Sequence, residues 1–137
     1  MPSLRKALFI FSIIILFNAG SLQAVSDYLL IVEVQILSQN SNDNDFIKIY
    51  NPLDSDLDIS NYKLRKRNSN GSESSIRVFP GGSNISAKGY FVWANSYDNY
   101  DVSIGANVSS TATLTRNYSI ALFTPDGTIL DALAWGE

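Results

Sequence analysis

The chain has 137 residues and contains neither cysteine nor histidine, which excludes disulfides, thiol chemistry, imidazole bases and nearly every zinc or haem site. Once an N-terminal export segment is set aside, this length allows one folded domain. The formal net charge is −3, from 10 basic and 13 acidic residues, and an acidic domain does not attract nucleic acid through its overall field.

Residues 1–24 have the three parts of a signal peptide. Two basic residues precede an apolar run of 11 residues, ALFIFSIIILF, and a stretch of small and polar residues follows it. A membrane-spanning helix needs roughly 20 apolar residues. The sequence therefore predicts export with cleavage after Ala24, and contact with a membrane only if the segment stays uncleaved. Its removal leaves eight cations against 13 anions.

The chain that follows is predicted to form short strands joined by turns. The first strand lies in YLLIVEVQIL, where Val32, Val34 and Ile36 share one face. The second strand, FIKIY at residues 46–50, alternates in the same way. It stops before Pro52, because proline lacks the amide that a strand ladder needs.

Residues 58–79 predict a β-hairpin. Asn70 and Gly71 form its tip, because this pair tolerates the positive φ of a tight turn. Tyr62 and Leu64 share one face of the first arm, and the basic residues of that arm share the other.

The second half of the chain predicts further strands. Residues 90–93 are apolar on both faces, as in a central buried strand. Residues 95–115 are the least regular and include a short strand expected at 102–104. Two last strands, at 119–124 and 128–135, are joined by the tight turn PDG. No window of twelve residues outside the export segment has the spacing of an amphipathic helix, so we expect an all-β sandwich of about eight strands.

The order of these segments resembles the lamin-tail domain. The matching stretches are IVEVQ, DFIKIYNP, LDISNYKLRKR, SAKGYFVWA and SIALFTPDGTILDALAWG. Glu33 corresponds to an acidic residue in the first strand of the family, and Asn51 to a strand-ending asparagine. Asn61 and Tyr62 replace the family's Gly-Trp pair. The resemblance covers residues 25–137 and implies an immunoglobulin-like β-sandwich.

The resemblance also implies a function. Family members with enzymatic activity generally have it in a separate domain, so it implies a non-catalytic binding or spacer module, at the cell envelope or outside the cell. The alternative is an accessory domain of a longer envelope-associated enzyme, a nuclease or phosphoesterase, which it positions on substrate. Bacterial members often continue beyond the position of Gly136, so the resemblance leaves open that this chain is truncated at its C-terminus.

The hairpin offers the first group of candidate binding residues. Lys63, Arg65 and Arg67 project together, and Arg77 of the other arm is expected to join them in a positive patch. The alternative is that these charges protect a sheet edge from aggregation. The expected partner is a protein or an envelope polymer, and no cofactor is expected.

A second group of candidates lies in the irregular segment. Tyr97, Asn99 and Tyr100 are found there, and rigid tyrosines among small polar residues are typical of recognition loops. The alternative is that both rings cover the open end of the sandwich.

The loop after the second strand contains weak metal candidates, Asp54, Asp56 and Asp58. Their spacing resembles the start of a calcium loop, but an EF-hand needs a glycine and a glutamate where this chain has isoleucine and arginine. Two interpretations remain open: a calcium site of looser geometry that includes Asp43 or Asp45, and an acidic, solvated turn.

No catalytic residue is predicted. SNYK at residues 60–63 matches the SxxK motif, but on an extended strand its serine and lysine point to opposite faces. Trp93 and Trp135 each end an apolar strand and are assigned to the core or its rim.

Overall fold

The computed structural model describes residues 28–36 and 44–136, so the predicted signal peptide lies outside the described residues. These residues form ten strands, a 3-10 turn and one turn of α-helix. The strands are β1 (Leu30–Gln35), β2 (Phe46–Tyr50), β3 (Leu57–Asp58), β4 (Lys63–Arg67), β5 (Glu73–Val78), β6 (Asn84–Ile85), β7 (Tyr90–Asn95), β8 (Val108–Ser110), β9 (Ser119–Phe123) and β10 (Ile129–Ala134). The helical turns are η1 (Tyr97–Asn99) and α1 (Tyr100–Ser103). None of the helices in this part of the chain is long and apolar enough to span a membrane.

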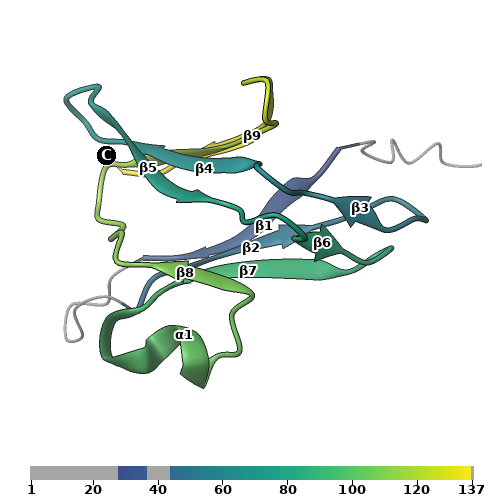
Figure 1. Ribbon diagram of the computed structural model, residues 1–137. Coiled ribbons are helices and arrows are strands. Elements are labelled where there is room, and N and C mark those ends of the chain that lie inside the picture. The colour runs from purple at the N-terminus through teal and green to yellow at the C-terminus, as the bar shows by residue number, and fades with distance from the viewer. Residues whose placement is uncertain (1–27, 37–43, 137) are drawn as a thin grey trace, which may run out of the picture.

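Two four-stranded sheets pack face to face (Figure 1). The first has the order β1-β2-β7-β8, and the second has the order β10-β9-β4-β5. The short strands β3 and β6 pair with each other at one end. Only β7 and β8 run parallel among the described strand pairs. The predicted all-β sandwich is confirmed, with two more strands than expected.

Both predicted hairpins are present, and each turns on a glycine. β4 and β5 are joined through Gly71 at φ 82°, and β9 and β10 through Gly127 at φ 95°. Positive φ of this size is open to glycine at little steric cost. The turn signals in the sequence therefore placed both connections correctly.

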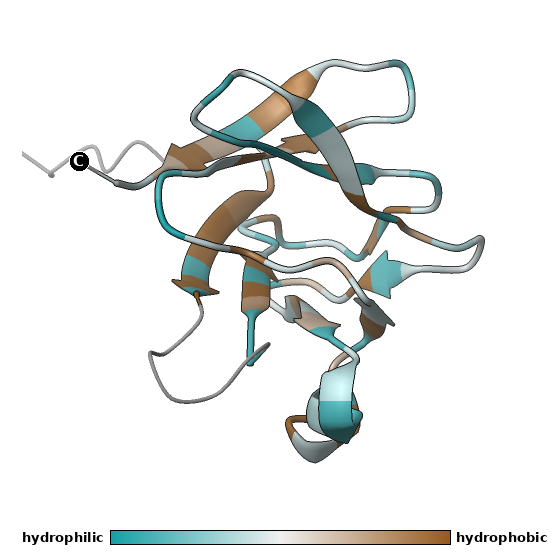
Figure 2. Ribbon diagram, turned by 90° about the vertical axis from the view of Figure 1, so that its left-hand side faces the viewer, coloured by the Kyte–Doolittle hydropathy of each residue, from teal (hydrophilic) through white to brown (hydrophobic). Residues whose placement is uncertain are grey.

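Apolar side chains from alternate strand positions fill the space between the two sheets. Figure 2 shows this alternation as brown and teal bands along the strands. Trp93 and Phe79 are the largest fully buried side chains, and Phe79 and Phe91 pack with ring centroids 4.9 Å apart. Trp135 is half-buried against this core. The assignment of Trp93 to the core and of Trp135 to its rim is confirmed.

β1 departs from the expected alternation. A β-bulge between Ile31 and Glu33 shifts its register against β2. Ile31, Val34 and Ile36 pack on the core, whereas Val32 is 47% exposed. The predicted shared face of Val32, Val34 and Ile36 is therefore wrong at its first residue.

β7 lies between β2 and β8, which confirms its central place in a sheet. One of its faces is buried throughout, and the other is buried only towards its end, where Val92 is half-buried and Ala94 is fully buried. Phe91 and Trp93 point into the core, whereas Tyr90 is 59% exposed and stacks on Tyr50 with centroids 5.0 Å apart. The expectation of burial on both faces is therefore wrong at Tyr90, where the outer face of this sheet is not covered.

The strand predicted at residues 102–104 is wrong. The chain there forms η1 and α1, and the short strand β8 comes later. Asp98 and Asn99, the last two residues of η1, adopt φ of 50° and 56° directly before α1. Asparagine and aspartate tolerate this left-handed conformation better than other non-glycine residues.

Candidate binding site

The basic hairpin arm is an interior strand of the second sheet. β4 lies between β9 and β5, so its alternate residues face either the core or the solvent. Leu64 is fully buried, and Lys63, Arg65 and Arg67 lie on the outer face. Edge protection does not explain these charges, because β4 is not an edge strand.

A carboxylate from β5 joins two of these cations. Glu73 Oε1 accepts hydrogen bonds from Arg67 Nε at 3.2 Å and from Arg67 Nη2 at 2.5 Å. Glu73 Oε2 lies 3.6 Å from Arg65 Nη2. The hydrogen bond and the charge of Arg67 lower the pKa of Glu73 below its usual value. All three side chains remain partly exposed, at 40–57%.

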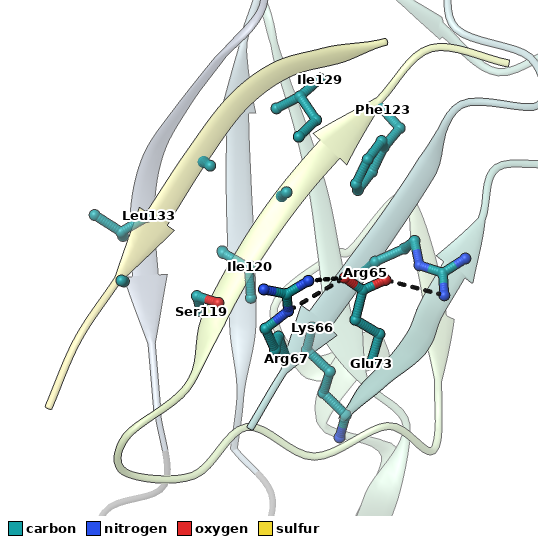
Figure 3. Close-up of a pocket in the computed structure, with 12 residues that line it drawn as sticks. Arg65, Lys66, Arg67, Glu73, Ser119, Ile120, Phe123, Ile129 and Leu133 are labelled. Atoms are coloured by element: carbon teal, nitrogen blue, oxygen red, sulfur yellow. Dashed lines mark hydrogen bonds and ion pairs between the residues drawn. The ribbon is translucent and has the colours of Figure 1, made fainter. Parts of the chain in front are cut away.

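An open groove of about 310 Å³ runs beside this cluster on the outer face of β4, β9 and β10 (Figure 3). Phe123 and Ile129 lie at one end of it, and the Arg65, Arg67 and Glu73 cluster lies along one side. The complete lining consists of Arg65, Lys66, Arg67, Glu73, Ser119, Ile120, Ala121, Phe123, Ile129, Ala132, Leu133 and Ala134. The groove therefore combines an apolar floor with a charged wall.

Strand register explains the composition of the floor. Arg65 lies opposite Ala121 of β9, which in turn lies opposite Ala132 of β10. Phe123 lies opposite Ile129 in the same pair of strands. Small side chains in the middle and large ones at the end leave a hollow between them. The sequence analysis missed these residues, although the alternation of SIALF could have shown that Ala121 and Phe123 share a face.

The surroundings of Arg77 and Lys66 differ from those of the outward-facing Lys63, Arg65 and Arg67. Arg77 lies opposite the buried Leu64, because β5 has an irregular register at this point, and it does not line the groove. Lys66 donates a hydrogen bond to the carbonyl of Thr113, and its Nζ lies 5.3 Å from the centroid of the Tyr118 ring. Lys66 thus links β4 to the segment that leads into β9.

The tyrosine loop lies on the opposite side of the sandwich. Figure 1 shows α1 next to the first sheet and away from β4 and β9. Tyr97 is 60% exposed, Asn99 is exposed, and the hydroxyl of the half-buried Tyr100 lies 3.0 Å from Gln35 Nε2, which donates to it. The structure does not bring this loop together with the basic strand.

The three loop aspartates each have a separate structural partner. Lys88 Nζ lies 3.1 Å from Asp54, the amide of Ala87 donates to Asp56 at 2.9 Å, and the amide of Ser60 donates to Asp58 at 2.8 Å. Hydrogen bonds from Ser60 also lower the pKa of Asp58. Within residues 28–36 and 44–136, no group of three or more acidic residues is placed to hold a metal ion.

Asp45 does not extend that acidic loop. It is fully buried before β2 begins, whereas the loop follows the other end of this strand. Its Oδ2 accepts a hydrogen bond from the amide of Leu114 at 2.6 Å. Asp43 lies outside the described residues.

Comparison with known proteins gives one family match. The family model described as Lamin Tail Domain matches residues 23–137, which is most of the chain. No curated protein matches the sequence.

Proposed function

We propose that this chain, which belongs to the lamin-tail domain family, is an exported binding module without catalytic activity. In this proposal the outer face of the second sheet binds an acidic protein or an acidic envelope polymer. Lamin-tail domains are immunoglobulin-like and generally non-catalytic binding modules. The signal-peptide pattern of residues 1–24 supports export.

The observation that supports this surface most strongly is the shared outward face of Lys63, Arg65 and Arg67. Glu73 is the one carboxylate among the groove-lining residues, so the cations outnumber it locally. The chain as a whole is acidic. Because surface charges are screened beyond about 8 Å at physiological ionic strength, a short acidic ligand on this face experiences mainly the local cations. A long polyanion also meets the acidic remainder of the surface.

Retention on immobilised short glutamate peptides tests this function, because a long polyanion would also meet the acidic remainder of the surface. The full chain is compared with the variant Lys63→Ser, Arg65→Ser, Arg67→Ser, and retention is expected to fall roughly tenfold, since each exposed contact contributes about 0.2–1 kcal/mol. The matched control is Lys48→Ser, Lys88→Ser, Arg116→Ser, which removes the same charge away from β4. Equal retention of the two variants would reject the proposed surface.

A further inference from the structure

We infer that the ligand of this surface is an extended peptide in which an acidic and an apolar residue stand two positions apart. Its carboxylate takes the place between Arg65 and Arg67 that Glu73 fills in the free protein. The apolar side chain enters the alanine-floored groove. This inference rests on the proposed function, because it assigns a ligand class to the same face.

The Glu73 contacts show that Arg65 and Arg67 bind one carboxylate together, each arginine at a different oxygen. Arg67 binds one oxygen through two nitrogens, and Arg65 approaches the other. A guanidinium presents planar, paired donors that match a carboxylate. Arginine has five N–H donors, and Glu73 approaches Arg65 at a single nitrogen. Arg65 therefore has further N–H groups that can donate hydrogen bonds to a ligand carboxylate.

A second observation concerns unused bonding capacity. Arg65 Nε is shielded from solvent and has no hydrogen-bond acceptor among the residues that the structure describes. A buried donor without a partner costs free energy, and a movement of the Arg65 side chain that exposes Nε to a ligand acceptor regains it. Glu73 therefore satisfies Arg65 less completely than Arg67, whose Nε already donates a hydrogen bond to Glu73.

Glu73 is placed to leave when a ligand arrives. Its side chain is 42% exposed on β5, an outer strand of the sheet, and its backbone pairs with Arg67. Rotation of the side chain leaves that backbone pairing intact. An exposed ion pair of this kind contributes only about 0.2–1 kcal/mol, so another carboxylate with additional contacts can replace it.

The apolar floor distinguishes a peptide from a phosphate polymer or a polysaccharide. Ile129 and Leu133 are 57% and 43% exposed, and Ala121 and Ala132 form the hollow between the strands. Burial of apolar surface yields about 25 cal/mol per Å², which only an apolar ligand group can exploit. In an extended peptide, side chains two positions apart lie on one face at about 7 Å. That spacing suits a charged wall beside an apolar floor.

The test titrates the full chain with an acetylated, amidated pentapeptide that has Glu and Leu two positions apart. Glu73→Gln is expected to tighten binding roughly two- to fivefold, because it removes the internal competitor. The matched control is Glu33→Gln, since Glu33 forms a comparable cross-strand pair with Lys48 on the other sheet. This control is expected to leave affinity unchanged.

Three outcomes overturn the inference alone, and a fourth overturns the proposed function on which it rests. Unchanged or weaker binding by Glu73→Gln rejects displacement, while loss of binding in Arg65→Ser, Arg67→Ser would still support the proposed function. Equal affinity for a peptide with Ser in place of Leu rejects the apolar contact. A peptide is rejected as the ligand if inorganic polyphosphate binds more tightly than the peptide and if Ala121→Phe does not change the affinity for polyphosphate. Undiminished retention of the triple Ser variant on short glutamate peptides removes the proposed function itself.

Discussion

Asn51 joins the loop after β2 to the end of β6 through one side chain. The residue is fully buried where β2 ends, and its side chain makes four hydrogen bonds. Nδ2 donates to the carbonyls of Ser55, Ile85 and Ser86 at 2.9, 3.2 and 3.1 Å, and Oδ1 accepts from the amide of Leu53 at 3.0 Å. A carboxylate of the same shape has no hydrogen to donate, so it would face three carbonyl oxygens with a negative charge.

We therefore predict that Asn51→Asp lowers the free energy of unfolding by about 3 kcal/mol or more, because one buried and two partly buried carbonyls lose their donor and face a buried charge. Urea denaturation at neutral pH measures this loss. Asn70→Asp is the control, since Asn70 is exposed at the hairpin tip, and surface substitutions usually stay within about 0.5 kcal/mol. Equal midpoints for the two variants would contradict the role given to Asn51.

At the scale of strands and turns, the sequence predicted what depends on local pattern. The outward face of β4 followed from alternation, and both hairpins followed from their turn residues. Register shifts are different, because a bulge depends on pairing with a neighbour. The sequence therefore missed the exposure of Val32 and the position of Arg77 opposite Leu64. It also missed the groove floor, which needs the registers of β4, β9 and β10 together, and α1, whose single turn is too short for a helical period.

Ser110 of β8 connects strands of both sheets. Its Oγ accepts a hydrogen bond from Trp93 Nε1 at 3.0 Å and donates one to the carbonyl of Ile76 at 2.7 Å. We predict that Ser110→Ala costs about 1–3 kcal/mol, because it leaves a donor and an acceptor without their partner. Ser109→Ala on the same strand is the control. Urea unfolding followed by tryptophan fluorescence compares them, and equal stability of both variants would contradict the link.

At the scale of the whole molecule, a polar side chain forms a hydrogen bond between the two sheets at each open side of the sandwich. Ser110 connects the first sheet to β5 on one side. On the other side, Asp131 of β10 accepts a hydrogen bond from the amide of Ile31 in β1 at 2.7 Å. Burial of the apolar core stabilises the packing of the two sheets, but this interaction is non-directional. The two hydrogen bonds are directional and fix how the sheets lie relative to each other. The outer face of the second sheet takes no part in this, which leaves it free for a ligand.

The carboxylates make the stability of the whole domain depend on pH. Arg67 lowers the pKa of Glu73 from its ordinary value of 4.5, and the hydroxyl of Thr124 together with the amide of Thr128 lowers that of Asp126 from 3.8. A folded-state pKa below the unfolded value adds stability above the unfolded value. That contribution is lost as the pH falls through the folded pKa. We therefore predict that the urea midpoint declines progressively below pH 4.5.

The double variant Glu73→Gln, Asp126→Asn isolates these two groups from the general effect of protonating an acidic chain. Its midpoint is expected to be lower than that of the wild type at pH 7 and to fall less steeply on acidification, because neither group titrates. High salt should reduce the difference only in part. Salt screens the Glu73 charge pair, whereas the hydrogen bonds of Asp126 lie within its own turn. Parallel pH curves for the variant and the wild type would show that these carboxylates are not the source of the acid sensitivity.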